Sequence, residues 1–95
     1  MYIVELTYLQ PLSAIDAQLE AHRAFLTAHY ERGIFIASGP KQPRDGGVFL
    51  VSGKISRDEL DALIEQDPFR IHKLADYRVT VFDPIKSHPQ VTDLL

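Results

Sequence analysis

VFLVSGKISRDELDALIEQDP, residues 48–68, contains a complete strand-to-helix transition and decides the fold. Its first five residues, Val48–Ser52, are mostly β-branched or aromatic, which is typical of a β-strand. Ser56 and Glu59 have the spacing of a capping box, which predicts that a helix begins there. Asp67-Pro68 is predicted to end that helix, because the residue before a proline is disfavoured in the α region.

The segments on either side predict three more strands and one more helix. Residues 2–9, 34–38 and 77–82 are rich in β-branched and aromatic side chains, and we interpret each of them as a strand. A helix is predicted over residues 13–32, with Ser13 as its N-cap. The stretch that follows Asp67-Pro68 adds at most one further helical turn.

The resulting order, β-α-β-β-α-β, predicts an α+β protein with the ferredoxin-like fold. Right-handed crossovers place both helices on one face of a four-stranded antiparallel sheet, with the first and third strands at its centre. Both faces of these two strands carry large apolar side chains, among them Ile3, Val48 and Leu50. The face without helices therefore needs a cover, which predicts a homodimer joined through the sheet faces with more than about 1,200 Å² buried.

The size and composition of the chain narrow the classes of function. Its 95 residues suffice for one domain, which we expect over residues 1–84, followed by a C-terminal tail over residues 85–95. The net charge is −3 and the basic residues form no stripe, so we expect no nucleic-acid or anionic-membrane partner. The absence of cysteine excludes disulfides and thiolate catalysis. Without a signal-peptide pattern or a long apolar run, the expected location is the cytoplasm.

Two polar residues are predicted to point into the core. His22 lies in the same sector of a helical wheel as Leu19 and Leu26, and we expect Leu26 to be plain core. Asp67 continues the inner face of the second helix, seven residues after Leu60. We therefore expect an imidazole nitrogen of His22 within about 3.5 Å of the Asp67 carboxylate, or bridged to it by one water. Such a pair can perform general acid/base catalysis, or it can be a structural tie between two helices.

A second group of residues is a candidate for binding a small molecule. Ser38, Gly39 and Pro40 form either a ligand-binding corner or an ordinary strand terminus. Phe69 is either the wall of an apolar pocket or plain core. His72 is close in sequence to Asp67 and is a further candidate for the site. The histidines show no tightly spaced ligand pair, so no metal is expected. Proton transfer needs no cofactor, and none is predicted.

In their order and spacing, several short motifs resemble the YCII-related family of small dimeric α/β-barrel proteins. The resemblance covers residues 2–82. The motifs are His22-Arg-Ala-Phe-Leu26, Gly33, Ser38-Gly39-Pro40, Asp45-Gly46-Gly47, Asp67-Pro68-Phe69 and Ala75-Asp76-Tyr77. Many members carry a glycine shortly after the Asp-Pro-Phe motif, where this chain has His72-Lys73, and this departure is expected to change one wall of the pocket.

The resemblance implies a ferredoxin-like fold paired into a dimeric barrel, with His22 and Asp67 as the active-site pair. It also implies activity on small ring compounds, including removal of chloride from a chlorinated hydroxyquinol. Our first hypothesis is therefore a cofactor-independent lyase or isomerase acting on a small cyclic or aromatic metabolite. His22 would move the proton, and Asp67 would orient it. The alternative is a non-catalytic small-molecule-binding or accessory dimer in which the pair is a structural tie.

Overall fold

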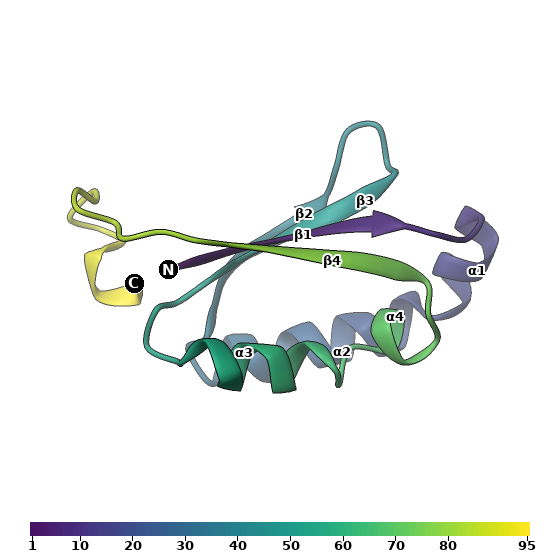
Figure 1. Ribbon diagram of the computed structural model, residues 1–95, viewed down its shortest axis with the longest axis horizontal. Helices are drawn as coiled ribbons and strands as arrows, with labels where there is room; N and C mark the ends of the chain where they lie inside the picture. Colours follow the sequence, from purple (N-terminus) through teal and green to yellow (C-terminus); the bar gives the residue numbers. More distant parts are fainter.

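Four strands form one antiparallel sheet in the order β2-β3-β1-β4 (Figure 1). The computed structural model describes all residues from 1 to 95. Its strands are β1 (Tyr2–Tyr8), β2 (Phe35–Pro40), β3 (Gly46–Val51) and β4 (Ala75–Val81). The central positions of β1 and β3 are those that the sequence predicts.

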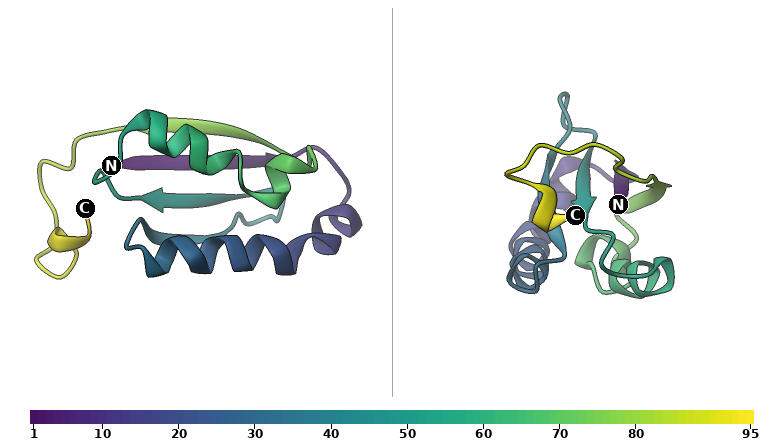
Figure 2. Two further views of the ribbon diagram at one scale, coloured as in Figure 1. Left: turned by 90° about the horizontal axis from the view of Figure 1, so that it is seen from below. Right: turned by 90° about the vertical axis from the view of Figure 1, so that its left-hand side faces the viewer.

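The longer helices lie side by side on one face of this sheet (Figure 2). They are α2 (Leu19–Glu31) and α3 (Arg57–Ile64). The short helix α4 (Pro68–Ile71) follows α3 on the same side of the sheet. The short helix α1 (Leu12–Ala17) lies beyond one end of the sheet (Figure 1). Together these elements confirm the predicted ferredoxin-like α+β fold. None of the helices is long and apolar enough to cross a membrane.

The predicted first helix is in fact two helices, because the chain leaves helical geometry at Gln18, with φ −109° and ψ 5°. The prediction that Ser13 caps this helix is also wrong. The carbonyl of Pro11 accepts hydrogen bonds from the amides of Ala14 and Ile15, so the first turn begins before Ser13. Proline at this position already has the φ angle that leads into a helix.

The second helix begins where the sequence predicts and ends earlier. Ser56 Oγ accepts a hydrogen bond from the Glu59 amide, and the Glu59 side chain accepts one from the Ser56 amide, both at 3.1 Å. The helix stops at Ile64, so Asp67 does not continue its inner face. Asp67 is instead the N-cap of α4, with Pro68 in the first helical turn. Aspartate followed by proline favours the start of a helix as strongly as it opposes continuation of the previous one.

The second strand extends further than predicted and includes Gly39-Pro40. Pro40 pairs with Gly47 of β3. Because β2 is an edge strand, the missing N–H of Pro40 leaves no ladder hydrogen bond unmade on the open side. Gly39 and Pro40 thus belong to the exposed end of an edge strand, and both line a cavity.

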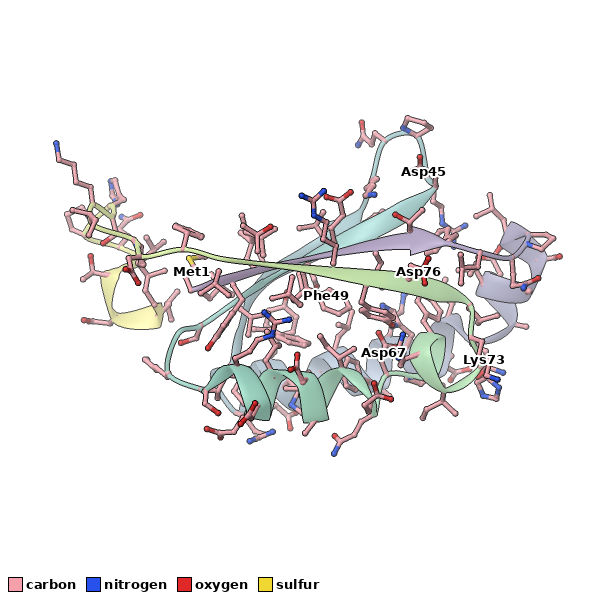
Figure 3. The ribbon with its side chains drawn as sticks, in the orientation of Figure 1. Met1, Asp45, Phe49, Asp67, Lys73 and Asp76 are labelled. Atoms are coloured by element: carbon pink, nitrogen blue, oxygen red, sulfur yellow. The ribbon has the colours of Figure 1, made fainter.

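The hydrophobic core fills the layer between the helices and the sheet, where the side chains of β1 and β3 meet those of the helices (Figure 3). His29 is a buried histidine at the edge of this core, and it has no acidic partner. Its ring lies 4.8 Å from the ring of Phe25 and 5.4 Å from that of Phe35, measured between centroids. Burial, together with the nearby charge of Arg32, lowers the pKa of His29. The lowered pKa favours the neutral imidazole, and its aromatic contacts in the core give His29 a structural role.

Acidification is expected to destabilise the protein through His29. The folded state binds this proton less readily than the unfolded chain, so the stabilisation is complete above pH 6.5, the ordinary pKa, and is lost as the pH falls below it. His29→Gln, measured by chemical denaturation at several pH values, should therefore flatten the dependence of unfolding free energy on pH. His72→Gln removes an exposed imidazole and is the control. An equal change of slope in both variants would contradict this role of His29.

The sheet face without helices is mixed in character. Ile3, Val48 and Leu50 point to this face and are half-buried, whereas Glu5 and Thr7 beside them are exposed. Large apolar side chains thus occupy this face as the sequence predicts, and on β1 they share it with exposed polar ones.

The C-terminal tail folds back on the end of β3. It ends in one turn of 3-10 helix, Thr92–Leu94. The Leu95 carbonyl accepts hydrogen bonds from Ser52 Oγ, at 3.0 Å, and from the Gly53 amide, at 2.9 Å. The tail thus lies at the end of the sheet where the chain also begins (Figure 1).

Candidate active site

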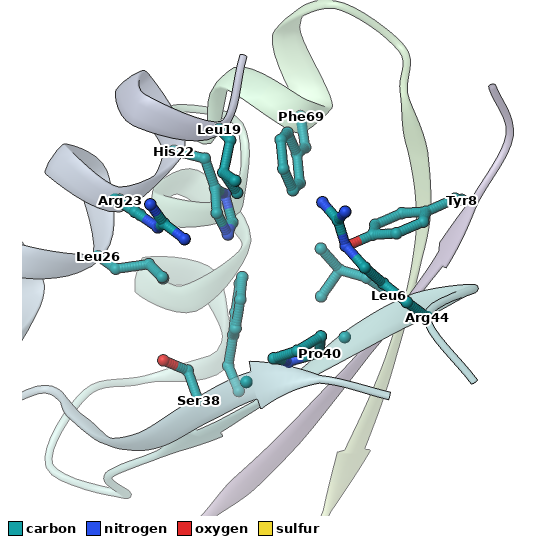
Figure 4. A pocket seen from close by; sticks show the side chains of 13 residues that line it. Leu6, Tyr8, Leu19, His22, Arg23, Leu26, Ser38, Pro40, Arg44 and Phe69 are labelled. Atoms are coloured by element: carbon teal, nitrogen blue, oxygen red, sulfur yellow. The ribbon is translucent and has the colours of Figure 1, made fainter. Parts of the chain in front are cut away.

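A cavity of about 350 Å³ opens between α2, α4 and the ends of β1, β2 and β3 (Figure 4). Its size is at the lower end of the range of small-molecule sites. His22 forms part of one wall, and Phe69 and Phe49 contribute its aromatic lining. The cavity therefore offers a small, partly aromatic space with an imidazole on its surface.

His22 and Asp67 are in direct contact. The Nδ1 atom of His22 lies 2.7 Å from Oδ1 of Asp67, and the two residues are 45 positions apart in the chain. Asp67 is completely buried, and His22 is 7% exposed. The distance agrees with the expectation from the sequence, although Asp67 reaches this position from the start of α4 rather than from the inner face of α3.

The Asp67 carboxylate accepts three hydrogen bonds. Besides His22, the Phe69 amide donates to Oδ1 at 3.0 Å and the Tyr77 hydroxyl donates to Oδ2 at 2.6 Å. Burial and the charge of Asp67 raise the pKa of the Tyr77 phenol far above its ordinary value, so this hydroxyl keeps its proton and remains a donor. A carboxylate that receives three donors is well suited to accept the Nδ1 proton of a neutral imidazole.

The second ring nitrogen of His22 is open to the cavity. Nε2 has no hydrogen-bond partner within the chain, and no fully buried side-chain nitrogen or oxygen lacks a partner. Nε2 must therefore be accessible, and His22 lines the cavity. With Nδ1–H donating to Asp67, Nε2 carries the lone pair that can accept a proton from a bound molecule.

Aromatic stacking fixes the plane of the imidazole. The ring of His22 is parallel to that of Phe69, with an interplanar angle of 4° and 3.9 Å between centroids. Phe49 stacks less closely, at 5.9 Å. Together with the bond to Asp67, these contacts hold His22 in one orientation towards the cavity, which is the preorganisation that proton transfer requires.

Most of the residues expected to bind a small molecule lie on this cavity. Ser38, Gly39, Pro40 and Phe69 all contribute to its lining. Leu26 also lines the cavity and is only partly buried, so the expectation that it is plain core is wrong.

His72 does not belong to the cavity. It is exposed, and it follows α4 at the C-cap position, on the outside of the helix layer. Lys73 is also exposed and has a φ of 55°, in the left-handed region that favours glycine. The difference at His72-Lys73 therefore concerns the end of a helix, and the expected change in the pocket wall is wrong.

Four residues with polar groups near the pair were not singled out from the sequence. Tyr8, Arg23 and Arg44 line the cavity, and Tyr77 holds the far oxygen of Asp67. Arg23 and Tyr77 lie inside motifs that carry the family resemblance, and Arg23 also directly follows His22; these signals could have drawn attention to them. No group of three or more histidine or acidic side chains gathers in a way that could hold a metal ion.

The fold and this site define a ferredoxin-like α+β protein with a buried His–Asp pair beside a small cavity. A family model described as the YCII-related domain matches residues 1–83, and the chain belongs to this family. No curated protein matches the chain.

Among solved structures, the chain is similar to 5-chloro-2-hydroxyhydroquinone dehydrochlorinase (TftG) from Burkholderia phenoliruptrix AC1100, in complex with 2,5-dihydroxybenzoquinone. The TM-score is 0.67 and the sequence identity 22%, over 87% of this chain and 94% of that chain. At this identity the likeness shows the shared fold.

Proposed function

We propose that the protein is a cofactor-independent acid/base enzyme of the lyase or isomerase type that acts on a small cyclic or aromatic compound. One observation carries this proposal: His22 donates through Nδ1 to a buried carboxylate, while its Nε2 is open to a cavity. This arrangement leaves a lone pair on Nε2 beside a space that can hold a small molecule, which supports a role for His22 in proton transfer. In this role Nε2 accepts the proton and Asp67 stabilises the imidazolium that forms.

Dehydrochlorination is the specific reaction that we propose to test. In this elimination the substrate reacts as its keto tautomer, in which the ring carbon that carries chlorine also carries a proton. Nε2 of His22 takes up the proton of a ring hydroxyl, the electron pair of that O–H bond forms a C=O bond, the ring double bond shifts to the chlorine-bearing carbon, and chloride leaves with the electron pair of the C–Cl bond, which gives a quinone. The similar structure is that of a dehydrochlorinase with a ring compound bound, which supports this choice. The flat stack of His22 and Phe69 beside the cavity suits a planar substrate.

Chloride release from 5-chloro-2-hydroxyhydroquinone, measured without oxygen, tests the proposal. His22→Gln should lower kcat/KM by at least about 100-fold, because general acid/base catalysis contributes about that much or more. His72→Gln removes an imidazole outside the cavity and should leave the rate unchanged. A wild-type protein that releases no chloride would refute dehydrochlorination, and an active His22→Gln variant would refute the role of His22.

The second candidate function is binding without catalysis, in which the pair is a structural tie. One observation favours it: Asp67 joins α2, α4 and β4 through His22, the Phe69 amide and Tyr77. Under this hypothesis His22→Gln would lower the free energy of unfolding and leave ligand affinity intact.

We further propose that two copies pair through the sheet faces that lack helices. Half-buried Ile3, Val48 and Leu50 lie together on that face and would gain cover from a second sheet. Sedimentation at micromolar concentration should give a dimer. Val48→Lys should shift the protein towards the monomer, and a monomeric wild type would refute the pairing.

A further inference from the structure

The two formally charged side chains that face the cavity are both basic. The lining contains the guanidinium groups of Arg23 and Arg44 beside the imidazole of His22, the proposed proton acceptor, and it contains no carboxylate. The chain as a whole has the opposite balance, with 13 acidic and 10 basic residues and a net charge of −3. Asp67, the nearest acidic partner of the site, lies behind His22 and is completely buried.

The two arginines differ in how their charge is used. Arg44 forms an ion pair with Asp16, and hydrogen bonding to Asp16 is the main cause that raises the pKa of Arg44. Arg23 forms no ion pair and no side-chain hydrogen bond within the chain. Arg23 therefore supplies the unneutralised charge of the cavity.

The position of Arg23 links this charge to the candidate base. Arg23 is the residue next to His22 on α2, and both side chains reach the same cavity. In Figure 4 the guanidinium of Arg23 lies beside the imidazole, while Arg44 approaches from the opposite side, close to Tyr8. A ring placed against His22 would thus bring a substituent within reach of Arg23.

We propose that the cavity selects ring compounds that carry an anionic oxygen, and that Arg23 is the residue that binds this oxygen. The proposal deepens the proposed function, since it names the substrate class of the same site. A planar guanidinium binds a carboxylate or another ionised oxygen through charge-assisted hydrogen bonds, which are stronger than neutral ones. Because Arg23 is exposed, the resulting preference should be moderate and should weaken as salt is added.

A pair of ring compounds that differ in charge and hardly in shape tests the proposal. The probes are 2,5-dihydroxybenzoate and 2,5-dihydroxybenzamide, titrated by calorimetry, with amide NMR shifts at Gly39 and Gly47 reporting binding in the cavity. The wild-type protein should bind the benzoate about tenfold more tightly than the benzamide, the effect of about one charge-assisted contact. Arg23→Gln should abolish this preference, and Arg23→Lys should retain part of it.

Arg57→Gln is the matched control, because it removes the same charge from an exposed site on α3 away from the cavity. It should keep the full preference. Equal affinity for the two probes, absence of binding by both, or a preference that survives in Arg23→Gln would each overturn the proposal.

Failure of the anion site and failure of the proposed function can be told apart by these experiments. Binding without an anion preference, together with chloride release, would refute the anion site alone. An anion preference without chloride release would refute dehydrochlorination alone.

Discussion

Asp67→Asn is expected to lower kcat/KM for chloride release by about 10²- to 10⁴-fold. The carboxylate is completely buried and supplies the negative charge that stabilises an imidazolium at His22. Asparagine has nearly the same shape but no charge, and it has one acceptor oxygen where the carboxylate has two. If that oxygen keeps its bonds to His22 and the Phe69 amide, the new amide group faces the Tyr77 hydroxyl, whose oxygen can accept from it but whose own proton loses its acceptor. The free energy of unfolding should therefore fall as well, by about 1–3 kcal/mol.

The control for this substitution is Asp76→Asn. Asp76 lies on β4 and is exposed, so the same change of charge should alter neither rate nor stability by much. Chloride release and chemical denaturation are measured on both variants. A rate for Asp67→Asn within a few-fold of wild type would show that the carboxylate is not needed for proton transfer, and the catalytic reading of the pair would then be wrong.

Gly46→Ala should be among the most destabilising single substitutions in the chain. Gly46 pairs with Thr7 where β3 meets β1. A Cβ atom at this position would overlap the Leu6 carbonyl oxygen and lie 2.8 Å from the Leu6 carbonyl carbon. Both atoms belong to the backbone of a central strand, so neither can rotate away. The strands must separate, at a cost of about 3 kcal/mol or more in the free energy of unfolding.

Gly39→Ala is the matched control, because Gly39 is also a strand glycine near the cavity and a Cβ there would meet nothing within 4 Å. Its free energy of unfolding should stay close to that of the wild type. The two proteins can be compared by urea denaturation followed by circular dichroism. Equal stability of the two variants would contradict the close backbone approach at Gly46.

Local signals in the sequence were enough to predict the architecture. The capping box at Ser56 and Glu59 depends on residues three apart, and it forms as predicted. The strand order follows from the order of elements, and it also agrees. The errors lie at boundaries where two signals compete. The sequence predicts that Asp67-Pro68 ends one helix, whereas in the structure it begins the next.

The contact between His22 and Asp67 was predicted from an incorrect helical phase for Asp67. The predicted distance is nevertheless correct, because the N-terminus of α4, where Asp67 is the N-cap, and the inner face of α2 border the same part of the core. The roles of Tyr77 and Arg44 could not be predicted in this way. Tyr77 reaches Asp67 across ten residues, and Arg44 reaches the cavity from the loop before β3. Such contacts depend on loop and strand register, which periodicity does not report.

The division of the site between distant parts of the chain makes it sensitive to partial unfolding. His22 comes from α2, and its partner Asp67 comes from the N-cap of α4, 45 residues later. Local opening of either segment separates the pair even when the sheet stays intact. Hydrogen exchange at the Phe69 amide, which is bonded to Asp67, would report such opening events directly. The fraction of molecules in which the pair is intact would then depend on the free energy of local opening of α2 and α4, and not on the free energy of unfolding of the whole sheet.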